Sequence, residues 1–332
     1  MRVTTSSIVR NYQHNLGLVQ SGQNTAYQKV LTHRNYSKAS QAPGLANQAA
    51  RLHRQYLKNQ DYIDTIKDTQ DRLDMASSVG NSMEELANEI LNDKGLASIN
   101  GTLGHEQRVT YSKILEEMQS NMLQFANTTY NDKYLFSGQH TSEPPFTIEG
   151  GTVKYLGLDV SNPDNLGKLN ELANESVYID VGMDISSGTI NSANAFDASI
   201  PAIKLLGYGT DSGVSKNLLS LTGEMAELLK SSDADWEAGN AGRFNDLMGQ
   251  FKKTHNNFID EKASVGINQN YLSTALDNHE DLDIAFQEQI NDVEYVDDAT
   301  AISDFYYAQY AYNAALNVGN SMLSASLLDF LN

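Results

Sequence analysis

The sequence predicts a mainly α-helical protein: a long, coiled-coil-like helical rod built from N- and C-terminal segments, with a small β-rich domain inserted between them. Three observations predict this fold. Apolar residues recur at alternating steps of three and four near both chain ends. Only 5 prolines occur in 332 residues, which permits long helices. The stretch from about 138 to 212 is rich in glycine and contains short β-prone runs.

The N-terminal segment predicts a thin helical seam. Gly17 and Gly22 interrupt it, and Asn, Gln, Ser and Thr dominate the remaining positions, so such a helix buries little apolar area by itself. The seam consists of Val9, Tyr12, Leu16, Val19, Gln23, Ala26 and Val30.

The predicted rod begins after Pro43-Gly44, a pair that punctuates the chain. Its seam runs from Leu45 through Asn59 to Ile90, and glycine turns at 94–95 and 100–101 are expected to end it. A second helix returns with an apolar face between 109 and 125. A helical pattern of apolar residues resumes near 218. A loop is expected around 233–235, and a very long helix is expected from about 242 to 298.

The inserted segment reads as β-containing. Residues 134–138, 152–156 and 177–181 are β-prone, and Gly207-Tyr208-Gly209 predicts a turn rather than a phosphate-binding loop. The chain therefore divides into five predicted segments. They are an N-terminal assembly arm (1–44), two rod parts (45–137 and 213–298), the inserted domain (138–212) and a C-terminal assembly arm (299–332).

The last segment carries a broad apolar stripe in strict register. Its members are Ile302, Phe305, Gln309, Tyr312, Leu316, Gly319, Leu323, Ser326 and Phe330, flanked by further apolar residues that include Leu327 and Leu328. Exposed apolar surface of this extent usually marks an interaction site. We therefore expect both chain ends to be mobile in the monomer and to become ordered when copies or neighbours stack. Tyrosines clustered at 306–312 suit either helix packing or subunit contact.

Charge is strongly asymmetric. The net charge is −19 and the pI about 4.6, which disfavours binding to nucleic acid or to an anionic membrane. Residues 1–60 contain eight Lys or Arg and no acid, whereas residues 263–332 contain eleven acids and no base. Opposite charge favours packing of the two ends on each other or on the ends of a neighbouring copy, although drift of composition would give the same pattern.

No catalytic, cofactor or metal constellation is recognisable in the sequence. Cysteine is absent, no histidine pair has i, i+4 spacing, and no Gly-x-Ser-x-Gly occurs. His279 lies on a helical seam and is expected to be a packed histidine rather than a ligand. No apolar stretch is long enough to span a membrane. The first ten residues lack the apolar core of a cleavable signal peptide.

Several short motifs carry a family resemblance. Residues 126–138 read Ala-Asn-Thr-Thr-Tyr-Asn-Asp-Lys-Tyr-Leu-Phe-Ser-Gly, residues 1–4 read Met-Arg-Val-Thr, and residues 326–331 read Ser-Leu-Leu-Asp-Phe-Leu. Together with the helical ends and the inserted domain, these motifs resemble the flagellin superfamily. Within it they look like the hook–filament junction family, the third of the hook-associated proteins. That family usually has two acids before the rod, whereas residues 40–44 here read Ser-Gln-Ala-Pro-Gly.

The resemblance implies a structural role without cofactors. Copies would form a ring between hook-associated protein one and the flagellin filament, outside the cell, after export through the flagellar type III channel. A cytoplasmic export chaperone would cover the C-terminal arm. The implied partner-binding residues are Val9, Tyr12, Leu16, Val19, Ile302, Phe305, Tyr312, Leu316, Leu323, Leu327, Leu328 and Phe330. Two other functions stay open: a flagellin filament subunit, and a secreted adhesin or glycan-binding protein that uses 139–212.

Overall fold

A computed structural model describes residues 5–98, 103–182 and 195–331, and its contacts divide the chain into two compact units. Unit 1 comprises Met1–Asp61 and His279–Asn332, and unit 2 comprises Tyr62–Asn278. Helices α2 (Pro43–Glu89) and α9 (Ala241–Glu294) each run through both units. The unit boundary thus falls inside these two helices, and the five segments drawn from the sequence stay a prediction.

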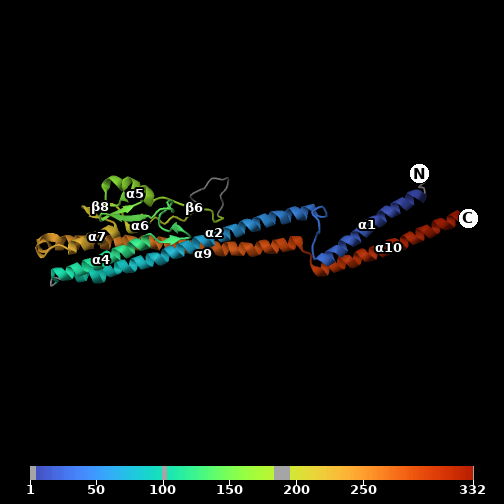
Figure 1. Ribbon diagram of the computed structural model, residues 1–332. Helices are drawn as coiled ribbons and strands as arrows, with labels where there is room; N and C mark the ends of the chain where they lie inside the picture. The colour runs from blue at the N-terminus through green and yellow to red at the C-terminus, as the bar shows by residue number, and fades with distance from the viewer. Residues whose placement is uncertain (1–4, 99–102, 183–194, 332) are drawn as a thin grey trace. The chain divides into compact units, whose positions relative to one another are not determined.

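Unit 1 is built from two antiparallel helix pairs. Helix α1 (Thr5–Thr32) packs along α10 (Asp298–Leu331), and the two lie side by side in Figure 1. The second pair joins the start of α2 to the end of α9 through a small core of Ala49, Leu52, Ile290 and Val293. Pro43 suits the start of α2, because the first turn of a helix needs no amide donor from that residue.

A buried polar contact extends the second pair. The Asn59 side-chain amide donates to the backbone carbonyl of His279 at 2.8 Å, and Nδ1 of His279 lies 2.6 Å from Oδ1 of Asn59. Both side chains are buried. The expectation that His279 is a packed histidine is therefore confirmed, and its partner is the polar residue that interrupts the α2 seam.

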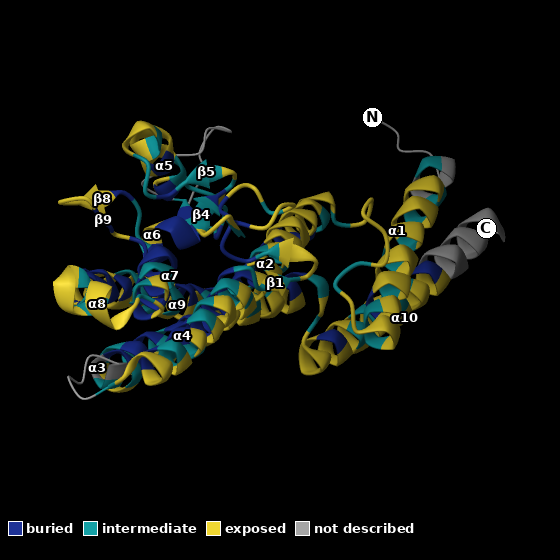
Figure 2. Ribbon diagram, turned by 60° about the vertical axis from the view of Figure 1, so that its left-hand side comes forward, coloured by how far each residue is buried: buried dark blue, intermediate teal, exposed yellow. Residues whose placement is uncertain are grey.

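Unit 2 contains the main core. The rest of α2 packs with α9, α4 (His105–Ala126) and α7 (Leu218–Leu229), and residues such as Ile66, Leu115, Phe251 and Leu272 are fully enclosed. Figure 2 shows buried residues concentrated in these helices and in the inserted strands. The side chain of Asn217 caps α7 by accepting from the Ser220 amide at 3.1 Å.

Small antiparallel sheets form the insertion. Strands β3 (Phe146–Glu149), β4 (Thr152–Tyr155) and β5 (Leu158–Asp159) make a three-stranded meander. The other strands pair in twos: β1 (Thr129–Tyr130) with β2 (Lys133–Tyr134), β6 (Tyr178–Ile179) with β7 (Phe196–Asp197), and β8 (Thr210–Asp211) with β9 (Val214–Ser215). Helices α5 (Leu166–Ala173) and α6 (Ala202–Leu206) lie between these strands in the sequence and contact each other. The predicted fold class, mainly helical with an inserted small β-rich domain, is confirmed.

Two local predictions are wrong. The chain continues past Glu89 as a π-helical turn (Ile90–Lys94) and a short helix α3 (Gly95–Ser98), because Gly95 fits against Met248 where a side chain would not. The expected loop at 233–235 is the short helix α8 (Asp233–Asp235), followed by a π turn (Trp236–Asn240). Ser232 caps α8 by accepting from the Asp235 amide at 3.2 Å, a signal that the sequence carries. The other predicted turn, 100–101, lies outside the described residues.

Candidate functional site

The residues predicted to bind partners lie on α1 and α10, the two paired helices of unit 1. On α1, Val9, Tyr12, Leu16 and Val19 are all half-buried, and Ala26 further along the same face is buried. Since the residues between them are exposed, this face is the one that α1 turns toward α10. The periodic sequence pattern therefore located the inner face of α1 correctly.

On α10 the inner face is narrow and built from small residues. Tyr12 Oη of α1 donates to the carbonyl of Ala315 at 3.1 Å. Gly319 is buried beneath the Tyr12 ring, where an added Cβ would collide with that ring. Further along, the rings of Tyr27 and Phe305 meet at 5.7 Å between centroids. The residues of α10 turned inward are Ala301, Phe305, Ala308, Tyr312, Ala315 and Gly319.

The predicted seam of α10 is therefore partly wrong. Ile302 and Leu316 are 45% and 41% exposed, and Gln309 is exposed as well. The neighbouring alanines occupy the inward positions because small side chains let the two helices approach closely. Ile302 and Leu316 consequently point away from α1, where a partner could reach them. The side chains of Leu323, Leu327, Leu328 and Phe330 lie outside the described residues.

The face of α10 turned away from α1 carries three exposed tyrosines. Tyr307 and Tyr310 are each 75% exposed, and Tyr306 is 65% exposed. On α1, Leu18 and Leu31 are exposed to a similar extent. Single exposed apolar residues need no explanation, but a group of them on one helix pair marks a surface that another molecule can cover.

A compact polar junction fixes the base of the helix pair. The Asn35 amide donates to the Glu294 carbonyl at 2.8 Å, and its side chain donates to the carbonyls of Val293 and Tyr295. His33 has a positive φ of 56° and places Nδ1 2.6 Å from Oδ1 of Asp298. These contacts hold the end of α1 beside the start of α10. Nothing in the apolar periodicity of the sequence points to them.

The Ala-Asn…Phe-Ser-Gly motif has a structural role in unit 2. Asn127 ends α4 and clamps β3, because its side chain donates to the Phe146 carbonyl at 2.8 Å and accepts from the Phe146 amide at 3.0 Å. Phe136 is fully buried, and its carbonyl accepts from the Ala202 amide at 2.8 Å. Gly138 has φ 64°, which favours glycine. The motif thus joins the helices to the insertion.

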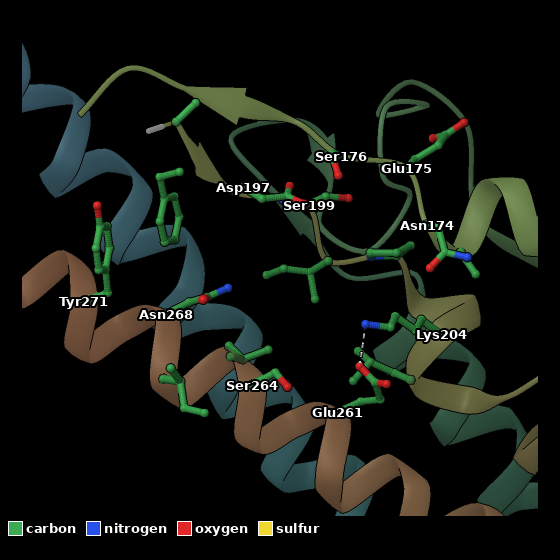
Figure 3. A pocket seen from close by; sticks show the side chains of 18 residues that line it. Asn174, Glu175, Ser176, Asp197, Ser199, Lys204, Glu261, Ser264, Asn268 and Tyr271 are labelled. Atoms are coloured by element: carbon green, nitrogen blue, oxygen red, sulfur yellow. Dashed lines mark hydrogen bonds and ion pairs between the residues drawn. The ribbon is translucent and has the colours of Figure 1, made fainter. Parts of the chain in front are cut away.

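Unit 2 also contains an open pocket of about 510 Å³ between the insertion and α9 (Figure 3). Lys204 of α6 and Glu261 of α9 form an ion pair across it at 2.9 Å. Asp197 accepts from the backbone amides of Val177 and Ser199, each at 3.0 Å. Phe196 stacks on Tyr271 with centroids 5.5 Å apart. Lys204 and Glu261 therefore neutralise each other, and backbone amides already hydrogen-bond the Asp197 carboxylate.

Metal-binding clusters and membrane-spanning helices are both absent from the described part of the chain. No group of three or more His, Asp or Glu side chains there is arranged to hold a metal ion. None of its helices is both long enough and apolar enough to cross a lipid bilayer.

The sequence is similar to known bacterial proteins. Residues 3–141 match the family described as bacterial flagellin N-terminal helical region. The chain is 23% identical over 314 residues to flagellar hook-associated protein 3 of Escherichia coli K12, with 90% of each chain covered.

Two solved structures share the fold. FlgL of Xanthomonas campestris aligns with a TM-score of 0.57 at 13% identity, covering 72% of this chain and 99% of that one. Flagellar hook associated protein-3 of Legionella pneumophila aligns with a TM-score of 0.56 at 10% identity, covering 74% of this chain and 99% of that one. At such identities these two likenesses establish the fold alone.

The fold, the motifs and the sequence matches together make this chain similar to flagellin-like structural proteins of the extracellular bacterial flagellum. Among such proteins, the chain is similar over 90% of its length to flagellar hook-associated protein 3, the kind of protein that the motifs predicted.

Proposed function

We propose that copies of this chain form the junction ring that joins the hook, through hook-associated protein one, to the flagellin filament. The observation that carries the proposal is the apolar outer face of the α1–α10 pair, with Tyr307 and Tyr310 each 75% exposed. Buried apolar surface stabilises association by roughly 25 cal/mol per Å² before the entropic cost of association is subtracted. A face of this kind gains most when subunits on both sides cover it.

The predicted partner-binding residues fall into two sets with different roles. Val9, Tyr12, Leu16 and Val19 hold the helices of one subunit together. Ile302 and Leu316, with the tyrosines between them, would contact neighbouring copies, hook-associated protein one and flagellin. Phe305 and Tyr312 support both roles, because they anchor α10 on α1 beside the exposed tyrosines. Leu323, Leu327, Leu328 and Phe330 continue the stripe in the sequence and are proposed to serve the same contacts.

The same stripe would need cover before assembly. We propose that a cytoplasmic export chaperone binds α10 and that the chain leaves the cell through the flagellar type III channel. Deleting 299–332 should therefore abolish chaperone binding in a pull-down with the purified chaperone. Unit 2 should still fold, since its core lies within Tyr62–Asn278. Retained chaperone binding by the truncated chain would place the chaperone site elsewhere.

Immunogold labelling tests the position of the protein in the flagellum. We expect a single patch at the base of the filament, and a deletion strain that sheds intact flagellin into the medium. Label along the whole filament would instead identify a flagellin filament subunit. A glycan array on the purified protein tests the alternative of an adhesin. Glycan binding through residues 139–212 would support that alternative.

A further inference from the structure

A second pocket, of about 560 Å³, lies within unit 2 beside the Phe-Ser-Gly motif. It forms where α2, the β1–β2 hairpin and the segment before β6 converge. The side chains that matter to its chemistry are Asp68, Arg72, Tyr130, Lys133, Tyr134 and Gln139. All of them belong to the same compact unit.

Arg72 is the unusual member of this pocket. Its side chain is half-buried, yet it makes no hydrogen bond or ion pair with any residue that the structure describes. Burial lowers the pKa of its guanidinium, and the nearby charge of Asp68 offsets this only in part. A guanidinium carries five donors in a rigid fork, so leaving it half-buried and unpaired is costly. The cost falls once an acceptor enters the pocket.

Lys133 adds a second positive charge at the rim. Its side chain is exposed and, within 5–98, 103–182 and 195–331, has no hydrogen-bond or ion-pair partner. The hydroxyls of Tyr130 and Tyr134 are likewise without hydrogen bonds to described residues. Two cations face one carboxylate, Asp68, so the pocket has room for one further negative charge with donors already in place.

Two other cations that are buried or that line a pocket in this unit are paired. Lys204 is paired with Glu261 at 2.9 Å across the first pocket. Arg108 is buried, bonds Asp233 at 2.7 Å and lies over the Trp236 ring. Unit 2 therefore satisfies its other buried arginine internally. The open pocket with unpaired cations points to a group supplied from outside the chain.

We propose that this pocket receives a carboxylate side chain from a second copy of this chain. The inference rests on the ring assembly proposed above. Arginine recognises carboxylates through two parallel hydrogen bonds, and this chain carries 42 acidic residues. Copies with a net charge of −19 repel one another, so an unpaired cationic pocket that accepts a neighbour's acid offsets part of that repulsion locally.

Carbodiimide crosslinking of isolated flagella tests this contact, because the reagent joins an amine to a carboxylate held in direct contact. We expect mass spectrometry to find Lys133 joined to an Asp or Glu of a second copy, in a product that the purified monomer does not give. The variant Arg72→Gln should lose this product. Lys113 on α4, an exposed lysine with no partner among the described residues, is the matched control, and its reaction should not change in Arg72→Gln.

The results of these experiments distinguish a failure of this inference from a failure of the proposed function. If immunogold places the protein at the filament base but Lys133 gives no product between copies, the inference is wrong and the proposed function stands. A product joining Lys133 to flagellin would overturn the second copy as the partner. If N-acetylaspartate shifts the Lys133 NMR signals of the monomer and no product forms between copies, the pocket serves a free carboxylate instead. Absence of the protein from flagella contradicts both proposals.

Discussion

At the scale of single residues, the close approach of α1 and α10 depends on one glycine. Gly319→Ala should force the Tyr12 ring out of its place, since the new methyl group would occupy the position of that ring. The Tyr12–Ala315 hydrogen bond, worth about 0.5–1.5 kcal/mol, is then lost. Because the monomer's arms are expected to exchange freely, the measurement is made on assembled flagella, where we expect faster hydrogen exchange of the α1 amides in this variant.

The matched control is Gly17→Ala. No atom of the described residues lies within 4 Å of a Cβ built at Gly17, so the methyl group meets none of them. Alanine is better than glycine in a helix by about 1 kcal/mol, and this substitution should slow the exchange of α1 amides in assembled flagella. If both variants slow exchange equally, the packing of Tyr12 on Gly319 does not hold the pair together.

A buried histidine in unit 2 links stability to pH. Burial lowers the pKa of His255 below its ordinary value of 6.5, with the nearby Lys262 acting in the same direction and Glu84 opposing it. Its Nε2 is enclosed and has no hydrogen-bond partner among the residues that the structure describes. The unfolded chain therefore binds a proton at higher pH than the folded chain, and unfolding becomes easier as the pH falls below 6.5.

The variant His255→Leu removes this linkage. Between pH 7 and pH 5 we expect it to lose less free energy of unfolding than the parent, by at most about 1.4 kcal/mol per pH unit below 6.5. Urea unfolding at several pH values measures the difference. His14→Leu, at an exposed position of α1, serves as the control and should keep the pH dependence of the parent. An unchanged slope in His255→Leu would contradict the assignment.

At the scale of elements, the α1–α10 pair of unit 1 buries little apolar side-chain surface. Along the α1–α10 pair, the described buried positions are Ala26, Ala301 and Gly319, all small residues. Such a pair gains little from apolar burial, which fits the prediction that the chain ends are mobile in the monomer.

Hydrogen exchange on the monomer measures that mobility. Amides of residues 5–32 and 305–331 should exchange close to the rate of an open chain, whereas those of α9 beside Phe251, Phe258 and Leu272 should be strongly protected. Assembly into flagella should protect the arms. Full protection of both arms in the isolated monomer would show that they need no neighbour.

The elements also show how far the sequence could predict the structure. Long helices, the inserted strands and the inner face of α1 follow from periodicity, because one repeated pattern extends over many residues. The α10 register was missed at Ile302 and Leu316, because a search for large apolar residues overlooks the alanines that make close contact. The π turn after Glu89 depends on the fit of Gly95 against Met248. The Arg72 pocket forms from segments far apart in the chain, which no local pattern reveals.

At the scale of the whole molecule, the tyrosines of α10 distinguish folding from assembly. The double variant Tyr307→Ser with Tyr310→Ser should leave the monomer's thermal stability unchanged within about 0.5 kcal/mol, since both rings are 75% exposed. In the flagellum the same rings are proposed to be covered. Truncating a tyrosine that acts as a hot spot at the centre of an interface costs about 2 kcal/mol or more of binding free energy. Cells with this variant should therefore swim poorly, and weak shearing should be enough to detach their filaments.

Leu57→Ser is the matched control, because Leu57 is 61% exposed on α2 and lies outside the arms. Equal loss of filaments in both variants would mean that general surface polarity, rather than the α10 face, determines attachment.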